Sequence, residues 1–320
     1  RRPCPAGHDT DEVVGRARPA MTPTKSQSID GVAVVDKPAG CTSHDVVGRC
    51  RRIFGQKKVG HGGTLDPDAT GILLVGLGRA TRLLRFLAPL PKSYVAEVVL
   101  GAATSTLDDS GEVVATWDMA GVGLDEVRVA AAGFVGDIEQ IPPMVSAVSV
   151  GGRRLHELAR AGIEVERASR PVTVHRIEVG LGSEPGAFRV EVDCSSGTYV
   201  RSLAADIGTA LGGGAHLRRL RRTAVGPFDA GVALDELGPG HVLAPAVAVA
   251  HLPAVTVDGG LAEAVGYGKV LEAGWAGDGP WAVLDGAGAL LAVYEPYGEG
   301  RVKPSVVIAP AVPHPGAAPT

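Results

Sequence analysis

The sequence predicts an α+β fold. Short apolar stretches with strand-like and helix-like spacing are intermixed along the first 250 residues, without the regular strand–helix–strand rhythm of a doubly wound parallel sheet. After about residue 250 the chain changes to short, glycine-rich strands. A chain of 320 residues is long enough for a larger domain and a small one. We therefore expect a main domain at 29–250 and a small β-barrel domain at 251–310, with a flexible tail at 1–28 and a disordered tail at 311–320.

Five elements are expected in the first hundred residues. Strands are predicted where apolar residues run together or alternate, and helices where they recur every three or four positions. Ser43 is the predicted N-cap of the first helix. In order, the predicted elements are a strand at Gly31–Val35, a helix from Ser43 to Phe54, a strand at Ile72–Val75, a helix at Ala80–Leu87 and a strand at Tyr94–Leu100.

The remaining elements follow the same two periodicities. Up to residue 250 they are a helix at Leu124–Phe134, a strand at Met144–Val150 with a turn at Gly151-Gly152, a short helix at Leu155–Ala161, paired strands at Val172–Val179 and Phe188–Cys194, and a helix at Tyr199–Leu211. Further on, the turn sequence Asp285-Gly286-Ala287-Gly288 predicts a hairpin of Trp281–Leu284 with Ala289–Tyr294. A last strand is expected at Val302–Ile308.

Composition is that of an ordinary soluble protein, with 45% hydrophobic and 4% aromatic residues. No apolar run approaches the roughly 20 residues that cross a bilayer, and the N-terminus lacks the apolar core of a signal peptide. Met21 is a candidate for the first residue of the translated protein. The four cysteines (Cys4, Cys41, Cys50 and Cys194) form no C-x-x-C pair, which argues against a zinc site or a disulfide framework and fits a reducing cytoplasm.

The net charge of −4 is unevenly distributed along the chain. Residues 231–320 hold three Lys or Arg against nine Asp or Glu, whereas residues 30–230 are balanced at 23 of each. Within that central part, Arg49–Arg85 carries eight basic and two acidic residues, and four arginines lie in His216–Arg222. Contacts with phosphates need local basic patches of this kind and do not need a basic protein, although such runs are usually solvated faces.

A glycine-rich stretch at Gly60–Gly71, G-H-G-G-T-L-D-P-D-A-T-G, places one carboxylate, that of Asp66, between Leu65 and Pro67. Proline restricts the residue before it to extended conformations, so a stiff turn displays the carboxylate. A rigid loop holding one acid suits a nucleophile or a general base. Taken alone, the same residues are also a common Asp-Pro turn.

Three further motifs change that balance. Asp36–Ser43 reads D-K-P-A-G-C-T-S, Lys92–Tyr94 reads K-S-Y, and Ser196–Arg201 reads S-G-T-Y-V-R. Together with the G-H-x-G-T-L-D-P-x-A-T-G stretch, and in this order, they resemble the TruB family, the bacterial tRNA pseudouridine-55 synthases. The resemblance implies a pseudouridine-synthase fold, with a mixed, largely antiparallel sheet flanked by helices. The C-terminal strands resemble a PUA-like β-barrel domain, although their acidic balance is unusual for direct RNA contact.

The resemblance also assigns roles to individual residues. Asp66 is the expected nucleophile, and Arg201 is the expected ion-pair partner that keeps it ionised. Tyr94 is the expected stacking partner of the flipped-out base and a participant in proton removal from carbon 5. The expected substrate-binding residues are Tyr199 and Leu220 in the pocket, His61 against the RNA, and Lys37 near the loop. Asp68 departs from the apolar residue expected at that position and would raise the pKa of Asp66 if both carboxylates faced the pocket.

The implied reaction converts uridine 55 in the T-loop of tRNA to pseudouridine. The uracil detaches from the sugar, turns, and is rejoined through carbon 5, so no redox cofactor, nucleotide or metal is required. Whether the nucleophile attacks carbon 6 of the ring or carbon 1′ of the ribose stays open. The expected partner is the T-arm of tRNA, and we expect a cytoplasmic monomer.

Three alternatives were weighed. A P-loop nucleotide enzyme is disfavoured because the Gly60–Thr64 stretch lacks the Lys-Ser/Thr ending. A metal hydrolase is disfavoured because His44, His61 and Asp66 show no ligand-like spacing. The serious alternative is a non-catalytic RNA-binding or tRNA-folding protein on the same scaffold, which would need no buried acid.

Overall fold

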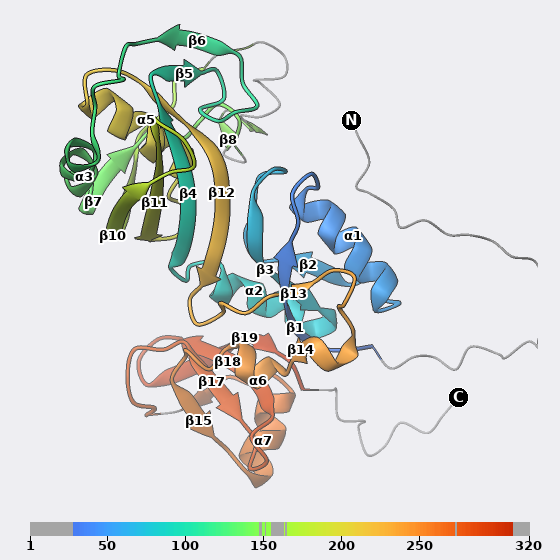
Figure 1. Cartoon of the computed structure of the whole chain (residues 1–320). Helices are drawn as coiled ribbons and strands as arrows, with labels where there is room; N and C mark the ends of the chain where they lie inside the picture. Colours follow the sequence, from blue (N-terminus) through green and yellow to red (C-terminus); the bar gives the residue numbers. More distant parts are fainter. Residues whose placement is uncertain are drawn as a thin grey trace, which may run out of the picture.

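The computed structural model describes residues 28–146, 149–150, 152–154, 163, 165–272 and 274–309, and these form two large sheets, two two-stranded ribbons and flanking helices (Figure 1). The predicted helix at Leu155–Ala161, most of the predicted tails and the turn residue Gly151 lie outside the described residues. No described helix is long and apolar enough to cross a membrane.

The larger sheet is mixed and largely antiparallel, which confirms the predicted α+β class. Its main path runs β13-β1-β3-β12-β4-β11-β10-β7, with β14 paired to β1 and β2 paired to β3. Only β1–β13 and β3–β12 are parallel pairs. The strands are β1 (Gly31–Lys37), β2 (Val59–His61), β3 (Thr70–Leu77), β4 (Lys92–Leu100), β7 (Gly136–Gln140), β10 (Arg170–Leu181), β11 (Ala187–Cys194), β12 (Ala215–Val225), β13 (Val232–Ala233) and β14 (Val242–Leu243).

The two halves of this sheet meet at a short contact. Strands β3 and β12 pair only at Thr70–Gly71 and Arg221–Arg222, and beyond these residues β3 pairs with β2 instead. Gly71 makes the contact possible, because its φ is +100° and a Cβ atom there would lie 2.1 Å from the carbonyl oxygen of Arg222. The Gly60–Gly71 loop therefore lies where the sheet divides.

Helix α1 (Ser43–Ile53) corrects the predicted N-cap. Thr42 is the cap: its Oγ1 accepts from the Asp45 amide at 3.1 Å, and the Asp45 carboxylate accepts from the Thr42 amide at 2.9 Å. Ser43 is buried inside the first turn, and its hydroxyl exchanges two hydrogen bonds with the backbone of Leu65. This serine supports the loop that carries Asp66.

The helix predicted at Ala80–Leu87 is also different. The chain forms a 3₁₀ helix, η1 (Gly78–Leu83), that leads into one turn of α-helix, α2 (Leu84–Leu87). Gly78 has a φ of +57°, and the carboxylate of Asp30 holds both the amide and the guanidinium of Arg79. These contacts tighten the first turns of the segment.

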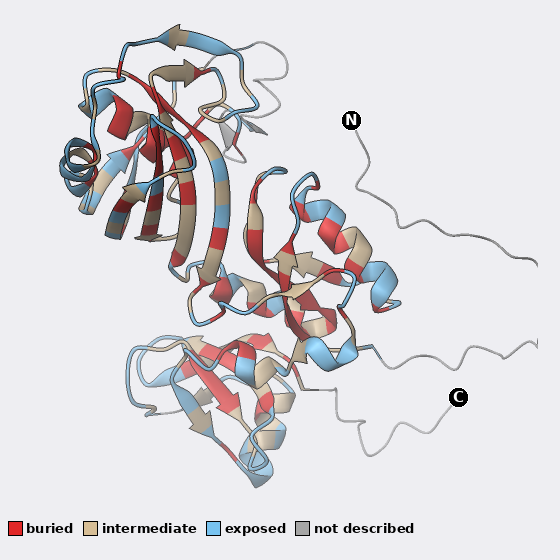
Figure 2. Ribbon diagram, in the orientation of Figure 1, coloured by how far each residue is buried: buried red, intermediate tan, exposed pale blue. Residues whose placement is uncertain are grey.

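Helices α3 (Leu124–Ala132) and α5 (Val200–Ala210) pack with β4, β10, β11 and β12 around one hydrophobic core. Figure 2 shows the buried residues of this core along the strands and on α5.

The predicted pairing of Val172–Val179 with Phe188–Cys194 is confirmed in β10 and β11. The predicted strand at Met144–Val150 is wrong for residues 144–146, and only β8 (Ser149–Val150) pairs, with β9 (Arg153–Arg154). Strands β5 (Ala102–Thr104) and β6 (Val113–Thr116) form a separate ribbon.

The second sheet is a curled half-barrel of five strands. Its order is β15 (Ala254–Thr256), β17 (Trp281–Leu284), β18 (Leu290–Pro296), β19 (Arg301–Val307) and β16 (Leu271–Glu272), so the described strands do not close into a complete barrel. The predicted hairpin is confirmed by the antiparallel pairing of β17 and β18. Helices α6 (Pro245–Ala248) and α7 (Gly259–Gly266) accompany it, and one hydrophobic cluster joins this sheet to β1, β3 and α2. The domain boundary at residue 250 stays a prediction.

Candidate active site

A pocket of about 270 Å³ opens where the two halves of the large sheet separate. The loop before β3, strand β4, the start of α5 and strand β12 supply its walls. It is somewhat smaller than the roughly 300–1,000 Å³ of typical small-molecule sites, which suits a single nucleoside. Five of the seven predicted site residues line it, namely Asp66, Tyr94, Tyr199, Arg201 and Leu220.

The central contact is an ion pair between residues 135 positions apart in the chain. Arg201 Nη2 lies 3.0 Å from Asp66 Oδ2. The Arg201 side chain, from the first turn of α5, is 5% exposed, whereas that of Asp66 is 43% exposed. The acid is therefore open to a molecule entering the pocket, while the guanidinium is fixed behind it.

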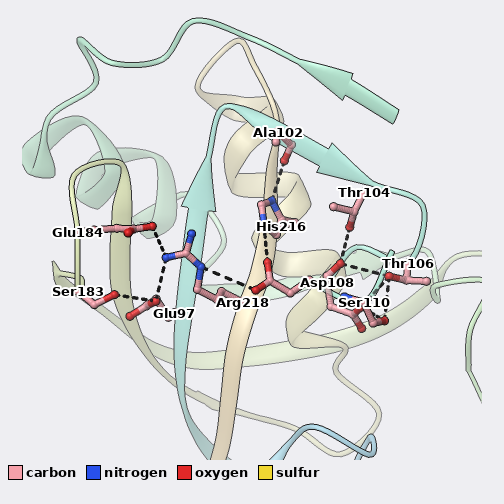
Figure 3. A network of polar contacts seen from close by, with 11 residues as sticks. Glu97, Ala102, Thr104, Thr106, Asp108, Ser110, Ser183, Glu184, His216 and Arg218 are labelled. Carbon is pink, nitrogen blue, oxygen red and sulfur yellow. Dashed lines mark hydrogen bonds and ion pairs between the residues drawn. The ribbon is translucent and has the colours of Figure 1, made fainter. Parts of the chain in front are cut away.

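Arg201 holds a second acid that the sequence analysis did not identify. Its Nη1 lies 3.2 Å from Asp108 Oδ2, and it also donates to the carbonyl oxygens of Thr106 and Val145 at 3.1 and 2.8 Å. Figure 3 shows the turn that carries Asp108, whose Oδ1 accepts from the hydroxyl of Thr106. The signal in the sequence was weak, because an Asp-Asp pair in a polar turn is common.

The pKa of Asp66 is set more by burial than by the ion pair with Arg201 that the sequence predicts. Burial raises the pKa of the Asp66 carboxyl, and the charges of Asp108 and, least of all, Asp68 raise it further. Arg201 lowers that pKa, as predicted, but does not outweigh the burial. Asp68 itself is exposed. The ion pair thus limits the rise in pKa of a crowded carboxylate and leaves it more basic than an ordinary aspartate.

This balance predicts the acid side of the pH–rate profile. The carboxylate of Asp66 protonates as the pH falls through its raised pKa. The rate of the expected uridine isomerisation should therefore fall at a higher pH than it would with an ordinary aspartate. Asp108→Asn removes a charge that raises this pKa and leaves Arg201 entirely to Asp66, so the acid limb of kcat/KM should move to lower pH. Asp68→Asn, the matched control, should give a smaller shift in the same direction. An unmoved limb in Asp108→Asn would contradict the assignment.

Lys37 lies beneath the loop and outside the pocket lining. Its side chain is fully buried, and its Nζ donates to the carbonyl oxygens of Pro38, Cys41 and Pro67 at 2.9, 2.7 and 2.9 Å. The amide of Gly40 donates to Pro67 as well. These contacts support a role in positioning the Asp66 turn, and the predicted contact of Lys37 with substrate stays a prediction.

Tyr94 faces the acid from strand β4. It is half-buried and stands opposite Arg222 of β12 in the strand register. Burial raises the pKa of its phenol, so the ring is neutral at physiological pH. An aromatic ring in this wall presents a surface for a planar base.

Tyr199 and Leu220 complete the pocket from α5 and β12. The backbone of Tyr199 is clamped by the Gln140 side chain, which accepts from its amide at 2.7 Å and donates to its carbonyl at 3.0 Å. Leu220 is partly buried against the main core, so it serves packing and pocket wall together.

His61 ends strand β2 and does not line the pocket. Burial lowers the pKa of its imidazole, and the nearby charges of His44 and Arg222 lower it further. Its Nδ1 is buried and has no hydrogen-bond partner among the described residues. The predicted contact of His61 with RNA stays a prediction.

Two buried cations in the pocket were not assigned roles from the sequence. Lys92 and Arg222 are 7% and 2% exposed and line the pocket with Tyr94. Lys92 belongs to the K-S-Y motif and could have been found there. Arg222 was hidden in a basic run interpreted as a patch for phosphates. No group of three His, Cys, Asp or Glu within the described residues is arranged to hold a metal ion.

Comparison with known proteins identifies the class. Residues 51–200 match the family described as TruB family pseudouridylate synthase (N terminal domain), and residues 201–244 match the tRNA pseudouridylate synthase B C-terminal domain. The chain is therefore a pseudouridylate synthase, which is an isomerase.

The chain belongs to the TruB family. It is 49% identical over 290 residues to tRNA pseudouridine synthase B of Rhodococcus jostii (strain RHA1), covering 88% of this chain and 94% of the relative. The protein of that name from Mycobacterium sp. (strain KMS) is 46% identical over 293 residues, covering 88% and 97%. Four motifs that were recognised from the sequence thus fall within a likeness that spans most of the chain.

Solved structures share the fold. A Cbf5-Nop10-Gar1 complex matches with a TM-score of 0.68 and 30% identity, covering 88% of this chain and 85% of that chain. The structure of an H/ACA RNP bound to a substrate RNA containing 2′-deoxyuridine matches with a TM-score of 0.66 and 29% identity, covering 88% and 86%. Both likenesses support the mixed sheet with an attached half-barrel.

Proposed function

We propose that the chain converts uridine 55 in the T-loop of tRNA to pseudouridine at this pocket, with Asp66 as the nucleophile. The observation that carries the proposal is the Asp66–Arg201 ion pair at 3.0 Å, which places a half-exposed carboxylate against a buried guanidinium in a nucleoside-sized pocket. The names of the relatives, tRNA pseudouridine synthase B, support tRNA as the substrate.

The target nucleotide must first leave its stack, because its base has to enter the pocket to reach Asp66. Extruding a base from stacked RNA costs a few kcal/mol. Stacking on the ring of Tyr94 offsets about 1–3 kcal/mol of that loss. Tyr199 and Leu220 close the other sides of the pocket around the base.

The carboxylate of Asp66 then adds to the uridine, at carbon 6 of the ring or at carbon 1′ of the ribose. Arg201 holds the carboxylate in place and favours its charged form. The C1′–N1 bond breaks, the ring turns, a C1′–C5 bond forms, and the bond to Asp66 breaks again. The proton lost from carbon 5 is balanced by one gained at N1, so substrate and product are isomers; Tyr94 is the nearest candidate to assist the loss.

Binding of the tRNA backbone is expected to use only part of the predicted basic patches. Arg218 is engaged by Glu97, Asp109 and Glu184, and Arg221 by Asp36. Exposed cations of these patches include Arg219 on β12, Arg51, Arg52, Lys57 and Lys58 at the end of α1 and after it, and Arg82 and Arg85. We propose these as phosphate contacts, which would make tRNA binding weaken steeply as salt rises.

Tritium release from tRNA labelled at uridine carbon 5 tests the function. Asp66→Ala should release no tritium above background while binding tRNA as well as the wild type in a filter assay, because binding rests on the surface cations. Asp68→Ala, two residues away and exposed, is the control and should release tritium at nearly the wild-type rate. Tritium release by Asp66→Ala at the wild-type rate would refute the nucleophile. A wild-type protein that binds tRNA and releases none would favour the alternative of a non-catalytic tRNA-folding protein.

We also propose that the protein works in the cytoplasm, where its tRNA substrate is found, and as a monomer. Light scattering would test this against the chain mass of 32.6 kDa.

A further inference from the structure

The wall of the pocket formed by Lys92 and Arg222, the inner wall, carries two positive charges that the proposed route does not use. Their side chains are among the few buried cations of the described chain, at 7% and 2% exposed. Lys92 precedes Tyr94 by two residues on β4, and Arg222 is the cross-strand neighbour of Tyr94 on β12. Because alternate residues of a strand face the same side, both cations flank the ring on which the base would stack.

Within the described residues, neither cation of the inner wall has a carboxylate within ion-pair distance, whereas Arg201 has two. Lys92 Nζ donates to the carbonyl oxygens of Ala88 and Leu90. Arg222 donates to carbonyl oxygens of β3 and the Asp66 loop, from Nε to Ile72 at 2.7 Å and from Nη1 and Nη2 to Thr64 and Gly63 at 3.4 and 3.3 Å.

Burying charge without a counter-charge is costly, and neutral carbonyls relieve only part of that cost. A neutral uracil would not require two positive charges without counter-charges in the wall of its pocket. Of the charged side chains that line the pocket, three are cations and only Asp66 is an anion. Asp108 compensates Arg201 from outside the lining, so the positive excess is concentrated on the inner wall. Such an excess is expected where negative charge develops during a reaction.

We propose that Lys92 and Arg222 stabilise the negative charge that the uracil ring carries either after it detaches from the ribose or after Asp66 adds to its carbon 6. This inference rests on the proposed function and adds to it a site for the anionic form of the base. The ring would stack on Tyr94 with its carbonyl oxygens toward the inner wall.

The charge appears on the ring whichever carbon Asp66 attacks. If the carboxylate displaces the base at carbon 1′, the electron pair of the C1′–N1 bond leaves with N1 and spreads to the two carbonyl oxygens. If it adds to carbon 6, the pair of the C5=C6 bond moves through carbon 5 to the oxygen on carbon 4. In the first case carbon 5 of the ring attacks carbon 1′, displaces the carboxylate and removes the charge. In the second case the pair on carbon 5 forms the C1′–C5 bond while the C1′–N1 pair leaves with N1. The charge then disappears when N1 takes up a proton, and the carboxylate leaves carbon 6 as carbon 5 loses its proton.

Only Lys92 should lose its charge in the accessible pH range. Burial, and then the nearby charge of Arg222, lower the pKa of Lys92 to about 8. The other titratable groups facing it stay neutral there, because burial raises the pKa of Cys194 on β11 to about 11 and raises that of Tyr94 as well. The ammonium is therefore present below pH 8 and is lost as the pH rises through that value.

Single-turnover rates of pseudouridine formation, with tRNA binding measured separately, test the proposal. Lys92→Met should lower the rate by about 10²- to 10³-fold at pH 7 with tRNA affinity little changed, the size expected for one electrostatic contact in an active site. Lys303→Met, a surface lysine of the half-barrel paired with Glu295, is the control and should keep the wild-type rate.

The pH profile separates this role from a purely structural one. The wild-type rate should fall above about pH 8, and Lys92→Arg should abolish that fall because guanidinium keeps its charge. If Lys92→Met fails to fold, the Lys92→Arg profile decides the question alone. A wild-type alkaline fall that survives in Lys92→Arg, or a folded Lys92→Met at full rate, would overturn the inference. In those cases an inactive Asp66→Ala still leaves the proposed nucleophile intact.

Discussion

Arg201→Met is expected to lower the single-turnover rate of pseudouridine formation by at least about 10²-fold, the scale on which electrostatic active-site contacts act. The guanidinium is 5% exposed and contacts Asp66, Asp108 and two backbone carbonyls. Without it, two carboxylates face each other and the pKa of Asp66 rises further, so the nucleophile is protonated over more of the pH range. Arg201→Met should leave the dissociation constant for tRNA nearly unchanged, whereas substitution of the exposed cations that bind phosphates should raise it.

Two companion variants show whether the loss comes from charge. Arg201→Lys retains a cation but not the fork that reaches both acids, so it should recover only part of the rate. Adding Asp108→Asn to Arg201→Met removes the like-charge repulsion and should restore part of the thermal stability. A rate for Arg201→Met within a few-fold of the wild type would show that the ion pair does not act in catalysis.

Gly71→Ala is expected to destabilise the protein by about 3 kcal/mol or more, because a positive φ alone costs roughly 1–3 kcal/mol for a residue with a side chain. A Cβ at this position would also lie 2.1 Å from the carbonyl oxygen of Arg222, so β3 and β12 would have to separate. Their pairing at this point holds the two halves of the sheet together around the pocket.

The measurement is urea unfolding of the purified variant. Gly136→Ala, at the start of β7, is the matched control: its φ is +109°, but a Cβ there meets no atom within 4 Å. It should show the conformational cost without the clash and keep full activity. Equal losses for both variants would mean that the close approach of the strands contributes nothing.

Much of the fold could be predicted because each element carried its own periodicity. The apolar run at Ile72–Val75 and the alternation at Tyr94–Leu100 identified strands whose central residues are correct, although β3 and β4 extend two residues further at one or both ends. Local pattern could not resolve the segment after Gly78, where the distant Asp30 sets the first turns. The long strand β12 was missed because its arginines obscured the alternation of a half-buried strand.

Some residues of the candidate site could likewise be identified from the sequence, and others only from the structure. Asp66, Tyr94 and Arg201 lie in recognisable motifs, and the structure brings all three to one pocket. Asp108 has no motif and matters only through a contact with a residue 93 positions away. Arg222 looked like a surface cation, and its burial follows from the divided sheet, which no short stretch of sequence reveals.

The hydrophobic cluster behind β3 has a consequence for how the enzyme is made. Ile72 and Leu74 share that cluster with Val306 and Ile308, which come from the end of the described chain. During translation, the side of β3 that faces this cluster is therefore not fully covered until residues 306–308 have left the ribosome. A nascent chain that already contains Asp66, Tyr94 and Arg201 therefore still lacks part of the apolar packing behind the strand that follows the Gly60–Gly71 loop.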